Sequence, residues 1–193
     1  MKTTNQSILE NKITSPMTKL IIEKTKLTNV IKIIPPTIFD DFRGSYIETY
    51  NEPIYTENGI KTKFIQDDIS TSKKNVLRGI HGDNKTWKLV SCLYGTFYLV
   101  VINWNTNSKE YKKWISFDMD VNNPFQILIP PKFGNGHLIT SNKAIFHYKQ
   151  STLYDRKSQF TINWNDPNLN IKWPTNKPIL SERDNNNAAN IKK

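Results

Sequence analysis

The chain has 193 residues, of which 37% are hydrophobic and 11% aromatic, so it can bury one sizeable core and is expected to form one domain. Its formal net charge is +10, yet the basic residues form no block of five or six, which argues against nucleic-acid binding and favours a small anionic ligand. The longest apolar run, residues 97–102, is too short to span a bilayer and no signal-like segment precedes it, which predicts a cytoplasmic protein without a membrane partner.

Both ends of the chain are polar. Residues 1–25 and 185–193 carry too little apolar surface to offset the entropy lost on ordering, so we expect disordered tails around a domain of residues 26–184. Within that domain, runs of β-branched and aromatic residues separated by Pro, Gly, Asn and Asp predict strands at 30–34, 45–50, 63–69, 75–80, 88–103, 113–119, 125–129 and 144–150.

Helical periodicity of useful length is absent, with only weak candidates at residues 8–13 and 54–61. Gly95 should divide the longest strand run into a hairpin, because glycine readily adopts the positive φ that a tight turn needs. Many short strands at regular spacing predict an all-β sandwich or barrel.

The single cysteine, Cys92, cannot form an internal disulfide, which suits a reducing compartment, and its apolar surroundings predict a buried structural thiol. The three histidines include no His-x-His pair, so a metal site is disfavoured. His147 alternates with Phe146 and Tyr148 and shares its face with Lys149, which favours a histidine on the solvent side of a strand.

His81 lies in the segment N-V-L-R-G-I-H-G-D, residues 75–83, in which Gly79 interrupts a strand pattern. Such a glycine often marks a bulge, and a bulge here would bring Arg78 and His81, three positions apart, to the same pocket. From the pattern alone, a core or surface histidine fits this position as well as a catalytic one.

This segment and several others, in order, resemble the nucleotide-diphospho-4-keto-sugar 3,5-epimerases, the dTDP-4-dehydrorhamnose 3,5-epimerase family. The resemblance covers roughly 150 residues, a typical domain length, and implies a jelly-roll, cupin-like barrel. The segments that carry it are F-D-D-F-R-G-S-Y-I-E (39–48), F-I-Q-D-D-I-S-T-S-K-K (64–74), R-G-I-H-G-D (78–83), T-W-K-L-V (86–90), I-P-P-K-F-G-N-G-H (129–137), F-H-Y-K (146–149), W-N-D-P-N-L-N-I-K-W-P (164–174) and I-L-S-E-R-D (179–184).

The resemblance implies a role for ten side chains. His81 matches the general base, Asp166 the carboxylate that orients it, Tyr148 the general acid on the opposite face of the sugar, and Lys88 a cation near the 4-keto oxygen. Binding of the nucleotide diphosphate is expected from Arg43, Glu48, Gln66 and Arg78, packing on the base from Tyr154, and an unspecified pocket contact from His137.

These residue types suit the inversion of a carbon beside a ketone. A His–carboxylate pair can take the acidified C–H proton near neutral pH, and a tyrosine across the ring can return a proton to the other face. Lysine can stabilise the enolate oxygen, and arginine can hold phosphate oxygens by two hydrogen bonds. The resemblance implies no metal or other cofactor, a homodimer with an N-terminal strand beside the partner's pocket, and a role in making deoxysugars or heptoses for surface polysaccharide.

The chain departs from the rhamnose-type pattern near the sugar. Gly82 and Asp83 follow His81, the segment before His137 reads G-N-G-H, and Leu99 stands where those enzymes carry an aspartate near the lysine. The R-G-I-H-G-D and G-N-G-H forms are closer to epimerases of GDP-linked 4-keto-heptoses, which predicts that branch and leaves GDP and dTDP both open as the nucleotide.

Other functions are compatible with parts of the pattern. An epimerase acting at C3 only, a 3,4-ketoisomerase on a similar fold, or a non-catalytic nucleotide-sugar binding protein would keep most of these residues. Asp166 could form an ordinary Asx turn before Pro167, and Lys88 could be an ordinary strand lysine. A cupin-type metal-dependent dioxygenase is disfavoured by the missing His-x-His pair.

Overall fold

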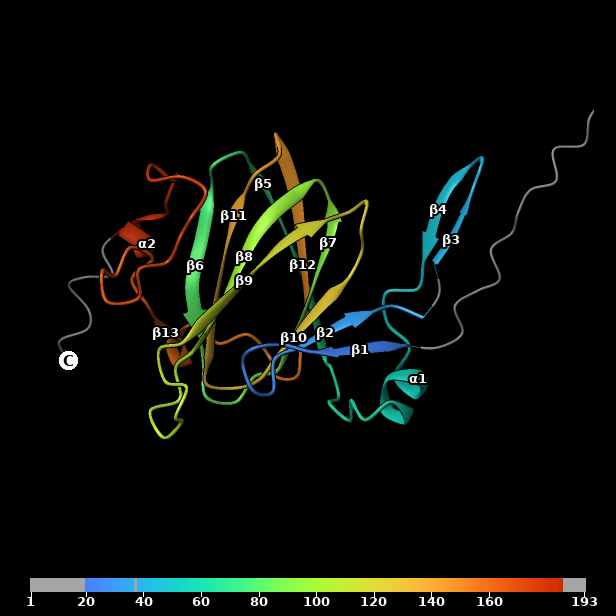
Figure 1. The fold of residues 1–193 in the computed structure, drawn as a ribbon, viewed down its shortest axis with the longest axis horizontal. Coiled ribbons are helices and arrows are strands. Elements are labelled where there is room, and N and C mark those ends of the chain that lie inside the picture. The colour runs from blue at the N-terminus through green and yellow to red at the C-terminus, as the bar shows by residue number, and fades with distance from the viewer. Residues whose placement is uncertain (1–19, 37, 186–193) are drawn as a thin grey trace, which may run out of the picture.

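The computed structural model describes residues 20–36 and 38–185, so the expectations for residues 1–19 and 186–193 and the helix candidate at 8–13 lie outside the described residues. Within that part, a six-stranded and a five-stranded antiparallel sheet face each other, which confirms the all-β jelly-roll prediction (Figure 1). None of its helices is long and apolar enough to cross a membrane.

The larger sheet has the order β1-β2-β10-β7-β12-β5. Its strands are β1 (Ile21–Lys24), β2 (Ile31–Ile34), β10 (Gln126–Ile129), β7 (Lys88–Tyr94), β12 (Lys143–Gln150) and β5 (Gln66–Lys73). β1 pairs along its whole length with β2, so the ordered domain begins inside the range 1–25 that the sequence predicted as a tail. The short apolar pair Ile21 and Ile22 was too small a signal to indicate a strand.

The smaller sheet has the order β13-β6-β11-β8-β9. Its strands are β13 (Phe160–Thr161), β6 (Leu77–Gly82), β11 (Phe133–Ile139), β8 (Thr96–Asn103) and β9 (Trp114–Asp120). The remaining elements are β3 (Ile38–Asp41), β4 (Gly44–Ile47), α1 (Glu52–Glu57), the 3₁₀ turn η1 (Arg156–Ser158) and α2 (Glu182–Asn185). The helix α1 confirms the weak candidate at 54–61, but it begins two residues earlier and ends four residues earlier.

Gly95 ends β7 with a φ of +69°, but the predicted hairpin is wrong. β7 pairs with β10 and β12 in one sheet, whereas β8 pairs with β11 and β9 in the other. Gly95 therefore marks the corner where the chain passes between sheets, and a Cβ there would lie 2.1 Å from the Lys143 carbonyl oxygen. The glycine predicted where the strand ends, but it could not predict which strands pair on either side of that point.

The main core fills the space between the two sheets with alternate side chains of their central strands, among them Val90, Ile127 and Phe146 from one sheet and Phe97 and Leu99 from the other. Cys92 is buried in this core, and burial raises the pKa of its thiol to about 11, which confirms the structural role predicted for it.

The segment of residues 50–64, with α1, packs Tyr50, Tyr55 and Phe64 against the outer face of the larger sheet. This cover buries part of a face that local alternation assigns to solvent. His147 is 9% exposed, and its Nε2 lies 3.0 Å from the Asp67 carboxylate, so the predicted surface histidine is wrong. Lys149 shares that face as predicted, with its ammonium group 5.0 Å from the Tyr50 ring centroid.

Candidate active site

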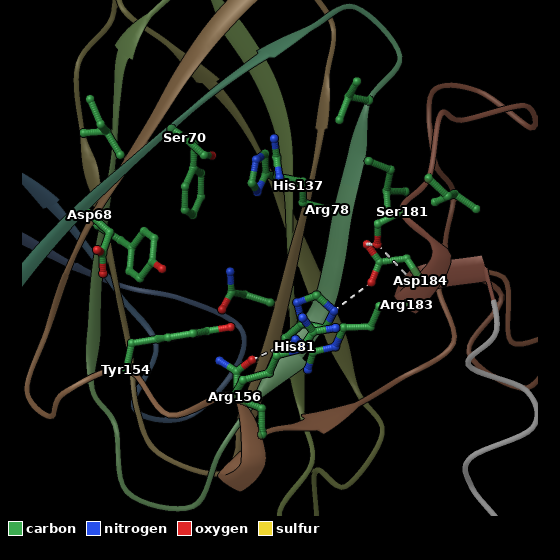
Figure 2. Close-up of a pocket in the computed structure, with 18 of the residues that line it drawn as sticks. Asp68, Ser70, Arg78, His81, His137, Tyr154, Arg156, Ser181, Arg183 and Asp184 are labelled. Atoms are coloured by element: carbon green, nitrogen blue, oxygen red, sulfur yellow. Dashed lines mark hydrogen bonds and ion pairs between the residues drawn. The ribbon is translucent and has the colours of Figure 1, made fainter.

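A cavity of about 800 Å³ lies between the two sheets at the end where α2 and η1 approach them (Figure 2). Seven of the ten side chains that the sequence singles out line it: Gln66, Arg78, His81, Lys88, His137, Tyr148 and Tyr154. They come from β5, β6, β7, β11, β12 and the loop after β12, so the fold gathers residues from most of the chain.

The bulge predicted at Gly79 is confirmed. β6 carries an extra residue opposite β11, because Asn135 pairs with His81 while His137 pairs with Arg78. Gly79 has a φ of +116°, and a Cβ on it would lie 2.7 Å from both the Asn135 carbonyl oxygen and the Gly136 Cα. The bulge places Arg78 and His81 in the same cavity, where a regular strand would separate them.

His81 pairs with Asp184, not with Asp166. Its Nε2 lies 2.7 Å from Oδ1 of Asp184, which is 3% exposed and also accepts hydrogen bonds from Ser181 Oγ and the Gly79 backbone N–H. Asp166 instead closes an Asx turn, accepting from the Asn168 backbone N–H at 2.8 Å, and it does not line the cavity. The prediction for Asp166 is therefore wrong.

The electrostatics of the pair favour neutral His81 and ionised Asp184. Burial lowers the pKa of His81, although the hydrogen bond to Asp184 acts in the opposite direction. Burial would raise the pKa of Asp184, but the hydrogen bonds from His81, Ser181 and Gly79 hold it below its usual value. A neutral His81 that donates its Nε2–H to Asp184 carries its lone pair on Nδ1, as a general base requires.

Tyr148 enters the same cavity from β12, on the sheet opposite to that of His81. Burial, helped by the negative charge of Asp68 on the neighbouring strand, raises the pKa of Tyr148 to about 12. The phenol therefore keeps its proton at neutral pH and can donate it.

Lys88 is buried, and its Nζ donates to Oδ1 of Asn135 at 3.1 Å. Burial lowers the pKa of Lys88 to about 8, with Asp83 acting to raise it and Arg183 to lower it. Leu99, which stands where the rhamnose-type enzymes carry an aspartate, is fully buried in the main core. The oxygen that Lys88 contacts belongs to Asn135 instead.

His137 lies deep in the cavity wall and stacks on Phe146, with ring centroids 3.9 Å apart and nearly parallel. Burial lowers the pKa of His137 to about 3, with the charges of Arg78 and His81 acting in the same direction. Its Nε2 is buried and has no hydrogen-bond partner among the residues that the structure describes. Neutral His137 is therefore unsuited to act as a cationic contact.

Arg43 and Glu48 do not line the cavity. Arg43 lies at the tip of the β3–β4 hairpin, which stands away from the two sheets in Figure 1, and its guanidinium pairs with Asp41 at 2.6 Å. Glu48 accepts a hydrogen bond from the Asn51 side chain just after the hairpin.

The sequence reading missed several cavity residues: Asp184, Asn135, Arg156, Gln159, Ser181 and Arg183. The segment I-L-S-E-R-D resembles a family motif, but the resemblance implies no role for its residues. Its Ser181 Oγ accepts a hydrogen bond at 3.2 Å from the backbone N–H of Asp184, three positions later at the start of α2, which is a recognisable capping signal. No group of three or more His, Cys, Asp or Glu placed to hold a metal ion occurs within residues 20–36 and 38–185.

Comparison with known proteins gives consistent matches. The family model for dTDP-4-dehydrorhamnose 3,5-epimerase matches residues 24–191. The dTDP-4-dehydrorhamnose 3,5-epimerase of Salmonella typhimurium is 37% identical over 170 residues, which cover 86% of this chain and 92% of the relative. The dTDP-4-dehydrorhamnose 3-epimerase of Streptomyces niveus is 30% identical over 155 residues, 78% of this chain and 75% of the relative.

Among solved structures, the Legionella pneumophila dTDP-6-deoxy-D-glucose-3,5-epimerase in complex with dTDP-4-keto-L-rhamnose superposes with a TM-score of 0.81. It is 34% identical in sequence, and the match covers 86% of this chain and 90% of that one. The family match, residues 24–191, includes every residue that lines the cavity.

Proposed function

Because the chain belongs to the dTDP-4-dehydrorhamnose 3,5-epimerase family, we propose that it inverts C3, C5 or both of a nucleotide-diphosphate-linked 4-keto sugar. The observation that carries the proposal is the His81–Asp184 pair on one wall of a cavity that Tyr148 enters from the opposite sheet. Inversion needs a base on one face of the sugar ring and an acid on the other, which a one-sided binding pocket does not provide.

In the proposed mechanism, Nδ1 of His81 takes the proton from the carbon next to the ketone. The electron pair of that C–H bond moves onto the keto oxygen, and the resulting enolate is stabilised by the Lys88 ammonium group. Asp184 holds the imidazolium that forms. Tyr148 then gives its proton to the same carbon from the other face, so the enolate collapses back to a ketone with the configuration inverted.

The outer part of the cavity suits a nucleotide diphosphate. Arg78 donates its Nε–H to Ser72, and its other guanidinium N–H groups make no hydrogen bond within residues 20–36 and 38–185, so they can bind phosphate oxygens. Tyr154 lies near the opening with half of its surface exposed, and its backbone N–H donates to Gln66, which fixes the loop that carries it. We propose that the Tyr154 ring packs on the nucleotide base.

A second copy of the chain would complete this outer part. The β3–β4 hairpin carries Arg43 and exposes Phe42 and Tyr46, which are 84% and 64% exposed, and exposed aromatic side chains on a protruding hairpin are typical of a contact surface. We propose a homodimer in which the hairpin lies at the partner's cavity and Arg43 and Glu48 contact the substrate there.

The nucleotide is proposed to be dTDP, because the Salmonella and Legionella relatives, 37% and 34% identical to this chain, are named for dTDP-linked sugars. A GDP-linked heptose is the second candidate. Of the departures that predicted it, Gly82, Asp83 and Leu99 do not line the cavity, whereas Asn135 of the G-N-G-H segment does. Asn135 is therefore where a different sugar would be recognised.

A ligand test and a product test together decide the proposal. A rise in melting temperature with dTDP and not with GDP would support dTDP, and the reverse result would support the heptose branch. Incubation with each 4-keto sugar, followed by proton NMR of the product, should show inversion at C3, at C5 or at both. An unchanged sugar that nevertheless binds would indicate a non-catalytic nucleotide-sugar binding protein.

A further inference from the structure

Arg183 lines the cavity beside the proposed catalytic groups, and it has no partner of opposite charge among the described residues. It directly precedes Asp184 in α2, and its guanidinium donates to Gln159 Oε1 at 3.1 Å and to Thr161 Oγ1 at 3.0 and 3.3 Å. Both acceptors are neutral, and no ion pair of Arg183 occurs in the part of the chain that the structure describes. The positive charge is therefore fixed in place and not neutralised (Figure 2).

The charges that act on His81 come from three elements. Asp184 and Arg183 approach it from α2, Lys88 from β7 and His137 from β11. Asp184 favours the protonated ring, whereas the cations Arg183 and Lys88 favour the neutral ring. His137 is neutral, for the reasons given above, and adds no charge.

The charges that act on Lys88 are Asp83, in the loop after β6, and again Arg183. Asp83 caps its own loop by accepting from the backbone N–H groups of Lys85 and Thr86, so its position is fixed as well. Among the residues that the structure describes, Arg183 is the one charged group that acts against protonation of both His81 and Lys88.

A base that is hydrogen-bonded to a buried carboxylate risks holding its proton permanently, because the carboxylate stabilises the imidazolium. We propose that Arg183 is a positioning residue whose fixed charge opposes Asp184, so that His81 is neutral when the substrate binds and releases its proton after each turnover. The proposal rests on the proposed role of His81 as the base. It assigns to the Arg183–Asp184 sequence a paired role, one residue to orient the imidazole and one to limit its affinity for a proton.

Removing the positive charge of Arg183 should change the pKa values of His81 and Lys88 in a defined direction, which can be measured. In Arg183→Gln, burial and the Lys88 charge still oppose the attraction of Asp184, but the contribution of Arg183 is lost, so the pKa of His81 rises and its neutral fraction at pH 6 to 7 falls. The pKa of Lys88 also rises, because Arg183 no longer repels its ammonium group. Both limbs of the pH–rate profile should therefore move to higher pH, by about 0.5 to 1 pH unit for the loss of one unit charge in the cavity.

The experiment compares three variants over pH 5 to 10. kcat and KM of the full chain are measured with the 4-keto sugar nucleotide for wild type, Arg183→Gln, Arg183→Lys and Arg156→Gln, and circular dichroism checks the fold of each. Arg183→Lys keeps the positive charge but loses the planar guanidinium group, so both limbs of its pH–rate profile should return to their wild-type positions. Arg156→Gln removes an equal charge from the same cavity but not one that acts on His81, so its limbs should stay in place.

A readout without substrate makes the test independent of turnover. The chain has three histidines, so the ring signals in a histidine-labelled sample can be assigned by comparison with His81→Asn, and the His81 titration followed directly. A higher His81 pKa in Arg183→Gln and a restored one in Arg183→Lys would support the proposal. An unchanged His81 titration would overturn it, as would a higher KM with unmoved limbs, which would make Arg183 a substrate contact.

Failure of the underlying function gives a different result. If His81→Asn retained activity, or if wild type inverted none of the 4-keto sugars, the assignment of the base would be wrong whatever Arg183 does. If His81→Asn abolished activity and Arg183→Gln lowered kcat equally at every pH, only the role proposed for Arg183 would be wrong.

Discussion

The two ends of the proposed substrate site are built differently. The end proposed to hold the reacting carbon takes all its groups from one chain: His81, Asp184, Tyr148 and Lys88 line one cavity and are buried or half-buried. Hydrogen bonds fix His81 to Asp184 and Lys88 to Asn135. The end proposed to hold the nucleotide diphosphate is incomplete, because Arg43 lies on an exposed hairpin and pairs with Asp41 of the same turn.

The difference follows from what each end must do. Proton transfer needs groups held to a fraction of an ångström in a site with little water, which a barrel interior provides. Binding a flexible diphosphate tolerates contacts that form when a second surface arrives. Changes at the first end should therefore affect kcat, and changes at the second end KM.

The largest difference in kcat is expected between substitutions of two aspartates, Asp184 and Asp166. Asp184→Asn should lower kcat by about 10² to 10⁴, because the amide no longer orients His81 or stabilises its protonated form. Asp166→Asn, in the Asx turn, is the matched control and should stay within about twofold of wild type, since an amide oxygen can accept the same turn hydrogen bonds. Steady-state kinetics with melting curves for both variants check this, and equal losses in the two would contradict the assignment of Asp184.

Tyr148→Phe tests whether inversion needs a donor on the second face. The phenol is removed while the ring remains, so inversion should slow by about 10² to 10³. Because His81 can still remove and return the proton on its own face, exchange of the substrate hydrogen with solvent should persist. Loss of exchange together with inversion would place Tyr148 in the first proton transfer.

The fold and the site were predictable from the sequence to different degrees. Strand alternation identified most of the two sheets, but β11 was missed because Gly134 and Gly136 lower its strand propensity. The structure requires them, since a Cβ at either position would come within 2.9 Å of the Ile80 side chain on β6. The close approach of two strands depends on the tertiary structure. In the local sequence it shows only as glycines, which lower the predicted strand propensity.

Long-range contacts explain the other errors. Asp166 and Asp184 both follow plausible turn signals, and only the folded chain decides which carboxylate reaches His81, 103 positions away from Asp184. His147 was predicted on the surface because nothing in F-H-Y-K reveals its contact with the Asp67 carboxylate, 80 positions away. The bulge at Gly79, by contrast, was predictable because its cause lies in the residue itself.

Arg43→Gln tests the incomplete end. The substitution removes a proposed bidentate contact to phosphate, so KM should rise about tenfold while kcat changes little.

Mixing two inactive or weakened variants decides whether Arg43 contacts the substrate in the partner's cavity. Co-assembly of Arg43→Gln with His81→Asn should regain about a quarter of wild-type activity at low substrate, because half of the dimers are mixed and each has one intact site. No regain would place Arg43 at the cavity of its own chain or away from both.

The pH profile gives the smallest effect and reports on the buried end. His81 must be neutral, and burial lowers its pKa below 6.5, so the rate should fall only as the pH drops below that value. Lys88 must be protonated to stabilise the enolate, and with a pKa of about 8 it loses its proton on the basic side. Between pH 7 and 8.5 kcat should fall roughly fourfold. A flat profile up to pH 10 would contradict the role of Lys88.

The central claim is that His81 removes a proton from the carbon next to the ketone. Proton NMR of the purified protein in D₂O, with dTDP- and GDP-linked 4-keto sugars in turn, follows that step directly. Wild type should wash deuterium into C3, C5 or both with one of the two nucleotides, and His81→Ala should leave every carbon-bound proton of the ring in place. Exchange that persists in His81→Ala, or that is absent from wild type with both substrates, would contradict the claim.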